Sequence, residues 1–129
     1  MKVTLGKKPE MTPNLTKFNI EDEFKLNYRF PEGDKLIPLN LFNLTIEYYT
    51  KGNPEKFIAI MEDGNGIQNC ITDHETGTLK VIFENHNLKP GYLFAKFIFE
   101  FEDEDMADKK ATTIKIDPTN ILLIDNLYL

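Results

Sequence analysis

The sequence lacks serine and tryptophan altogether, and it has one cysteine, one arginine and two histidines in 129 residues. Without serine there is no serine nucleophile, and a single cysteine, Cys70, allows no intramolecular disulfide. Together with His74 and His86, Cys70 gives too few ligands for a zinc site built from cysteine and histidine. These scarcities exclude several common enzyme chemistries.

Basic clusters and long apolar runs are also missing. The 14 lysines are scattered among 21 acidic residues, and the formal net charge is −6. Phosphate binding needs clustered lysine and arginine, so we expect no nucleic acid as partner. No stretch approaches the length of a membrane span, and no apolar run follows the first lysine as in a secretory signal. We therefore expect no membrane span and synthesis in the cytoplasm.

What the chain does have is 41% hydrophobic residues, with phenylalanine and tyrosine well represented. That content is enough to form the core of one domain. Apolar and polar residues alternate over 24–30 and over 93–101, as in strands with one face in water. We expect further strands, alternating or short and apolar, at 42–48, 57–61, 66–72, 79–84, 112–116 and 121–124.

Turn residues separate these segments at regular spacing. Asp-Gly-Asn-Gly at 63–66 and Glu-Thr-Gly at 75–77 are typical of tight hairpins, and Lys-Pro-Gly at 89–91 is typical of a turn. Several other connections are too long for a simple meander, which favours a sandwich over a small barrel. The sequence predicts an all-β fold, an immunoglobulin-like or jelly-roll-type β-sandwich of about eight strands.

The first 20 residues differ from the rest. They contain two prolines and several lysines, and apolar residues are sparse after Leu5. We expect residues 1–20 to form an extended N-terminal arm or edge strand and residues 21–129 to form the sandwich domain. One interpretation is a frayed terminus with an edge strand at 2–5. The other is an arm that adds a strand to the sheet of a neighbouring subunit.

Three single residues carry reactive side chains. Cys70 lies in an expected strand with no basic cluster nearby in sequence, which favours a buried structural thiol. His74 lies in a turn, where we expect it to be solvated. His86 follows a strand, where its imidazole is expected to bond the backbone in a tight corner, with a general base as the other interpretation.

Acidic residues are densest over 102–105. This run is either the solvated tip of a hairpin or a site for a hard cation such as Ca²⁺, although it lacks the glycine and the oxygen spacing of an EF-hand loop. No spacing selects a pair of glycosidase carboxylates, and no glycine-rich phosphate loop occurs. The sequence therefore predicts no catalytic, cofactor-binding or metal-binding residue, and a protein that is not an enzyme.

The middle of the chain carries a pattern of strands and turns. In Thr-Leu-Lys-Val-Ile-Phe-Glu-Asn-His-Asn-Leu-Lys-Pro-Gly-Tyr-Leu at 78–93, an alternating strand ends in Asn85-His86, and a Leu-x-Pro-Gly turn at 88–91 leads into a long strand. Over 24–124, with a closing strand at 119–123, the chain resembles β-sandwich structural proteins of Bacteroidetes gut phages and prophages. These include fibre, baseplate and head-decoration proteins of crAss-like phages.

The resemblance implies a non-enzymatic virion structural protein or module that acts through protein–protein assembly. Its implied partners are other virion proteins and further copies of itself as a homo-oligomer. Its implied location is the virion, after synthesis in the bacterial host cytoplasm. The family has no catalytic residues to carry over. Met-Ala-Asp at 106–108 departs from the Pro-Asp-Gly type of turn expected after the long strand.

The alternative function is a carbohydrate-binding module, because β-sandwiches often present aromatic side chains that stack on sugars. Tyr48, Tyr49 and Tyr92 are the candidate stacking residues, and a glycan is then the ligand. The absence of tryptophan counts against this alternative.

Overall fold

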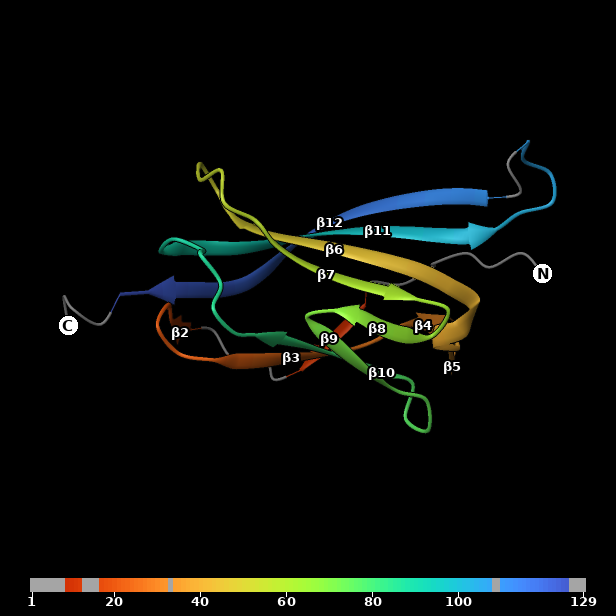
Figure 1. Cartoon of the computed structure of the whole chain (residues 1–129), viewed down its shortest axis with the longest axis horizontal. Coiled ribbons are helices and arrows are strands. Elements are labelled where there is room, and N and C mark those ends of the chain that lie inside the picture. Colours follow the sequence, from red (N-terminus) through yellow and green to blue (C-terminus); the bar gives the residue numbers. More distant parts are fainter. Residues whose placement is uncertain (1–8, 13–16, 33, 108–109, 126–129) are drawn as a thin grey trace.

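The computed structural model describes residues 9–12, 17–32, 34–107 and 110–125. The edge strand predicted at 2–5, and Asp108 in the turn that departs from the phage pattern, lie outside these residues. Two antiparallel-rich sheets pack face to face, one above the other in Figure 1. The predicted all-β sandwich is therefore confirmed.

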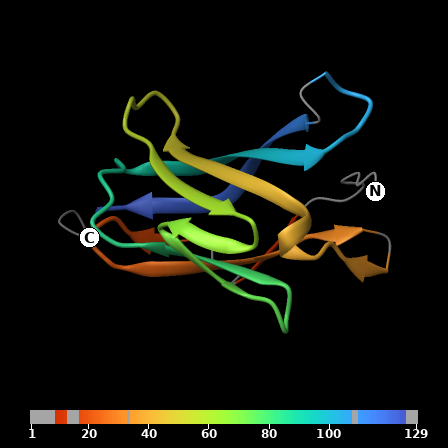
Figure 2. The ribbon, with the colours of Figure 1, turned by 45° about the vertical axis from the view of Figure 1, so that its right-hand side comes forward.

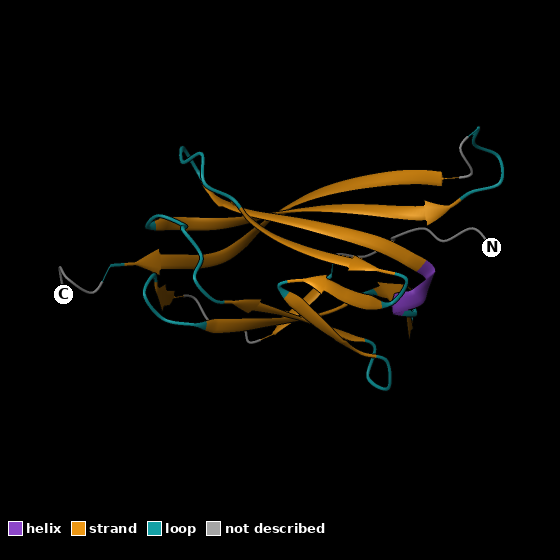
Figure 3. Ribbon diagram, viewed as in Figure 1, coloured by secondary structure: helices purple, strands orange, loops and turns teal. Residues whose placement is uncertain are grey.

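The two main sheets have four and six strands. In order, the small sheet contains β1 (Glu10–Thr12), β3 (Phe24–Arg29), β10 (Thr78–Phe83) and β9 (Cys70–Asp73). The large sheet contains β2 (Lys17–Asn19), β12 (Lys110–Ile124), β11 (Gly91–Glu102), β6 (Phe42–Thr50), β7 (Phe57–Glu62) and β8 (Asn65–Gln68). A two-stranded ribbon of β4 (Pro31–Glu32) and β5 (Lys35–Leu36) precedes a short 3-10 helix, η1 (Leu39–Leu41), shown purple in Figure 3.

The core lies between the two sheets and is rich in aromatic rings. Along β11 and β6, buried and half-buried residues alternate, as the sequence pattern predicts. Phe97 of β11 packs edge-to-face on Tyr28 of β3, with ring centroids 5.4 Å apart. Phe83 of β10 packs on Tyr48 of β6 in the same way at 4.7 Å. These contacts lock the large sheet onto the small one.

The N-terminal strands join both sheets. β1 pairs antiparallel with β3, whereas β2 pairs parallel with β12 at Leu122–Ile124. The described part of residues 1–20 therefore belongs to the sandwich of its own chain. Contact of the arm with a neighbouring subunit stays a prediction.

Two predicted strands differ in the structure. The segment at 66–72 is divided between β8 and β9, because Asn69 adopts a positive φ of 55° and turns the chain between the two sheets. The segments at 112–116 and 121–124 are one continuous strand, β12, with an irregularity opposite Tyr92 and Phe94. A positive φ of 62° at Asn120 allows this irregularity without a break.

Candidate functional site

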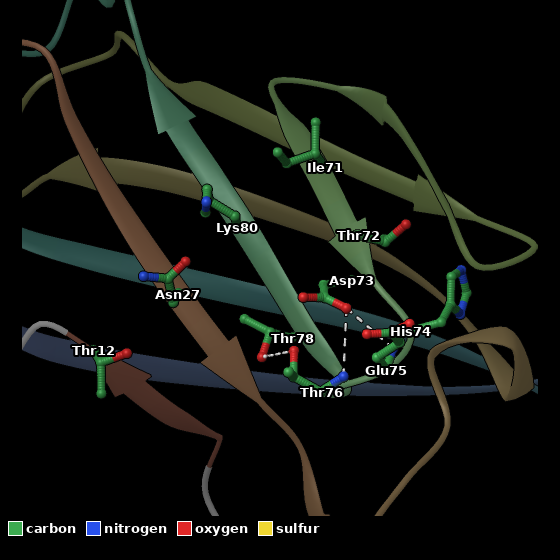
Figure 4. Close-up of a pocket in the computed structure, with 10 residues that line it drawn as sticks. All are labelled: Thr12, Asn27, Ile71, Thr72, Asp73, His74, Glu75, Thr76, Thr78 and Lys80. Atoms are coloured by element: carbon green, nitrogen blue, oxygen red, sulfur yellow. Dashed lines mark hydrogen bonds between the residues drawn. The ribbon is translucent and has the colours of Figure 1, made fainter.

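A hollow of about 750 Å³ lies on the outer face of the small sheet (Figure 4). Its floor is one cross-strand row, in which Asn27 lies opposite Thr12 on one side and Lys80 on the other, and Lys80 lies opposite Ile71. The turn between β9 and β10 forms its end wall. Its full lining is Thr12, Asn27, Ile71, Thr72, Asp73, His74, Glu75, Thr76, Thr78 and Lys80.

The Asp73 side chain at the end of this small-sheet hollow shapes the turn. The Asp73 carboxylate accepts hydrogen bonds from the backbone N–H groups of Glu75 at 3.0 Å and Thr76 at 3.4 Å. The imidazole of His74 points away from Asn27 (Figure 4) and packs closely against the backbone of Gly64. In the hydrogen bonds given for the residues that line this hollow, hydroxyl groups bond another hydroxyl or a backbone carbonyl, and the Asp73 carboxylate bonds backbone N–H groups.

Cys70 is a buried structural thiol. It lies in β9, where its Sγ donates to the carbonyl oxygen of Ile60 at 3.1 Å. Burial raises the pKa of the Cys70 thiol, which opposes formation of the reactive thiolate. This environment agrees with the structural role expected from the sequence.

His86 bonds the backbone in a corner, as expected. Its Nδ1 accepts from the backbone N–H of Leu88 at 3.4 Å. Its ring lies edge-on to three aromatic rings, with centroids 5.9 to 6.2 Å away, those of Phe24, Phe57 and Phe83. Burial lowers the pKa of His86, so the imidazole is neutral at physiological pH.

The acidic run follows the end of β11, where the chain turns toward β12. Glu102 pairs across the hairpin with Lys110, and the Asp103 carboxylate accepts from the backbone N–H of Asp105 at 2.9 Å. In the described part of this hairpin, and in the rest of the described chain, no three His, Cys, Asp or Glu side chains form a group suited to a metal ion. The position of the acidic run between β11 and β12 agrees with its interpretation as a hairpin tip.

The outer face of the large sheet carries several isoleucines among its polar residues. Ile114 and Ile116 of β12 are 55% and 61% exposed. Three further isoleucines on β7 and β11 are half-buried on the same side of the sheet. We call the set of Ile58, Ile60, Ile98, Ile114 and Ile116 the isoleucine face.

The strand register places these isoleucines in two groups. One group is on β11 and β12 and the other is on β7, with Thr45 and Glu47 of β6 between them. Ile98 lies opposite Ile114 on one side and Thr45 on the other, and Thr45 lies opposite Ile60. In the next row, Lys96 lies opposite Ile116. In Figures 1 and 2, no described helix or strand covers this face of the sheet.

The isoleucine face is not apparent from the sequence. The sequence gives one indication of it in β11. Ile98 lies between the core residues Phe97 and Phe99, so the alternation places its side chain on the outer face. A single isoleucine at such a position is common. The cluster forms only when three distant strands are paired in register.

A second, smaller hollow lies beside Tyr92, which is 61% exposed. It measures about 240 Å³ and is bordered by Lys51, Phe94, Pro118 and Asn120 among others. Pro118 and Asn120 belong to the irregular part of β12, opposite Tyr92 and Phe94. Of the three tyrosines suggested for sugar stacking, Tyr92 is exposed, Tyr49 is half-buried against Phe94, and Tyr48 is fully buried and therefore unavailable.

Comparisons with known proteins add no family. No protein-family model matches the chain, and no curated protein and no solved structure matches it significantly. The described residues include no helix with the length and apolar character needed to cross a membrane.

Proposed function

We propose that this chain is a non-enzymatic structural module that acts through protein–protein contacts made by the isoleucine face. The observation that supports this most strongly is the pair Ile114 and Ile116, both more than half exposed in one apolar cluster. Soluble monomers rarely leave such clusters in water, whereas assembly surfaces often contain them. The combination of exposed isoleucines with the flanking charges Lys96 and Glu100 fits a protein surface better than a polar substrate.

The energetics favour a covered face. Full burial of an isoleucine side chain contributes about 1.5–3 kcal/mol relative to full exposure. More than half of the surface of Ile114 and of Ile116 is exposed and therefore available for burial by a partner. The face is also rigid, because the opposite side of β6 and β11 is packed into the aromatic core. A rigid surface loses little conformational entropy when a partner binds.

The resemblance over 24–124 leads us to propose a virion as the place of assembly, with fibre, baseplate or head decoration as the role. The test is to purify phage particles from the source culture on a density gradient and detect the chain by mass spectrometry. We expect it to band with intact particles and to remain after a high-salt wash. Recovery only in the soluble fraction, with known coat proteins in the particle band, contradicts the virion proposal.

A carbohydrate-binding module is the second candidate, favoured by the exposed ring of Tyr92 beside a hollow that also presents Asn120 and Lys51. An exposed aromatic ring next to an amide suits the face of a sugar and its hydroxyl groups. Electrophoresis through gels that contain a polysaccharide tests it. Retardation that Tyr92→Ala removes and Tyr92→Phe keeps supports this candidate, and equal migration on every glycan counts against it.

A further inference from the structure

We infer that the isoleucine face binds the same face of a second copy of this chain, around a two-fold axis that passes over Ile98. This inference rests on the proposed function, because it names the partner for the same surface. It starts from the order of side chains along β11. On the outer face Ile98 lies between Lys96 and Glu100, two residues away on either side.

That order is self-complementary under a two-fold rotation. The axis passes over Ile98, lies parallel to the plane of the sheet and is perpendicular to the strands. It reverses the strand direction of the second copy and keeps β11 over β11. Ile98 then faces Ile98 of the second copy, and Lys96 faces Glu100 of the second copy. Because the interface is isologous, this contact occurs twice.

The same axis also sets the contacts of the neighbouring strands β6 and β7. On β6, the same operation places Glu47 over Asn43 of the second copy, and on β7 it places Glu62 over Ile58. No two like charges on these strands face each other. Aligned packing of two sheets tolerates a crossing angle of about 30°, which is the usual twist between packed sheets.

Shape supports the same arrangement. A shallow hollow of about 120 Å³ lies on the outer face at the Glu100 end, beside Thr112 and Asn43. At the opposite end, Ile116 is 61% exposed. The two-fold axis places Ile116 of the second copy over Thr112, at the β12 edge of the hollow of the other chain.

The carboxylate of Glu100 is already oriented on this face. Its Oε1 accepts from Nδ2 of Asn43 at 3.2 Å and lies 3.4 Å from Nζ of Lys110. Lys96 of a second copy would extend this exposed pair into a network of three charges. Networks of this kind contribute more than isolated surface pairs, and they select the orientation of the partner more than its affinity.

Charge exchange tests the inference. We would measure the solution mass by sedimentation velocity across a range of concentrations for wild type, Lys96→Glu, Glu100→Lys and the double variant. We expect a two-chain mass for wild type, at least tenfold weaker association for each single variant, and restored association for the double variant. Lys25→Glu is the matched control, because Lys25 is exposed on β3 of the other sheet.

Mixing the two single variants gives the sharpest result. In the mixed pair one chain presents two acidic groups and the other presents two basic groups, so each charge meets its opposite. We expect a two-chain complex from the mixture under conditions where each variant alone is a single chain. Circular dichroism checks that each variant is folded.

Two outcomes overturn the inference. One is a single-chain mass for wild type at the highest concentration, and the other is association that no charge variant changes. Neither depends on whether the chain is found in phage particles. A chain present in particles that stays a single chain in solution contradicts the self-association and leaves the virion proposal standing.

Discussion

At the scale of single residues, the most constrained polar groups are two tyrosines inside the core. The hydroxyl of Tyr48 on β6 donates to the hydroxyl oxygen of Tyr28 on β3 at 2.9 Å, and both side chains are fully buried. Burial raises the pKa of both phenols well above the ordinary value, so both are neutral. This hydrogen bond joins the large sheet to the small one.

The two hydroxyl groups should contribute to stability as a coupled pair. We expect Tyr48→Phe or Tyr28→Phe to lower the free energy of unfolding by about 1–3 kcal/mol, because the remaining buried hydroxyl loses its partner. The double variant should be closer to wild type than the sum of the single losses. Urea denaturation of all four proteins gives the coupling energy, and strictly additive losses contradict the account.

His86 should make stability depend on pH. Its pKa in the folded chain lies below the ordinary 6.5 because the ring is buried. As the pH falls below 6.5, the unfolded chain takes up the proton first, so the free energy of unfolding falls until the folded pKa is passed. Above 6.5 both forms are neutral at this site, and the stability contributed by neutral His86 is fully present.

The measurement is urea denaturation at several pH values between 7 and about 5, above most carboxylate titration. His86→Asn retains an acceptor for the backbone N–H of Leu88 and cannot titrate, so its stability should change less over this range. His74→Gln, at an exposed turn position, is the control. An unchanged slope in His86→Asn contradicts the assignment.

The sequence predicts single residues well where their neighbours in sequence define the environment. Cys70 in an apolar strand and His86 in a corner after β10 are such cases. The Tyr28–Tyr48 hydrogen bond is not predictable in this way, because it joins two strands that belong to different sheets. Only the packing of the sheets brings these hydroxyls together.

At the scale of elements, β12 shows how local chemistry keeps an irregular strand continuous. Between the pairs Tyr92–Leu122 and Phe94–Pro118, β12 has more residues than β11. The hydroxyl of Thr119 donates to the carbonyl oxygen of Leu93 at 2.8 Å and accepts from the backbone N–H of Ile121 at 3.3 Å. The side chain thus replaces ladder bonds that the irregularity interrupts.

Thr119→Val keeps the shape of the side chain and removes both hydrogen bonds. We expect a loss of about 1–2 kcal/mol in the free energy of unfolding, because two buried backbone groups lose a partner. Thr12→Val, at an exposed position of β1 in the other sheet, should change stability by less than about 0.5 kcal/mol. Thermal or urea unfolding distinguishes them, and equal effects would argue against a role for the Thr119 hydroxyl.

Alternation in the sequence predicts β3, β6, β7, β10 and β11 close to their observed bounds, because each has a continuous apolar face toward the core. It does not predict β1 and β2, which are three residues long and have little apolar periodicity. It also divides β12 into two strands, because Pro118 and Asn120 are typical of turns. Those short or irregular strands depend on pairing with distant partners.

At the scale of the whole molecule, the central feature is a rigid sandwich with exposed isoleucines on one outer face. The two outer faces differ: the small sheet has a polar row through Asn27 and Lys80, whereas the large sheet has the isoleucine face. The sandwich follows from the sequence pattern. The site does not, because the isoleucines come from three strands and become neighbours only in the assembled sheet.

The most direct test of this account is the solution mass by light scattering as a function of concentration. It compares wild type, Ile114→Lys/Ile116→Lys and Ile71→Lys, in which Ile71 is a 52% exposed isoleucine on the small sheet. The account predicts a two-chain mass for wild type and Ile71→Lys, and a folded single chain for the double variant on the isoleucine face. Three equal masses would contradict the claim that this face is the assembly surface.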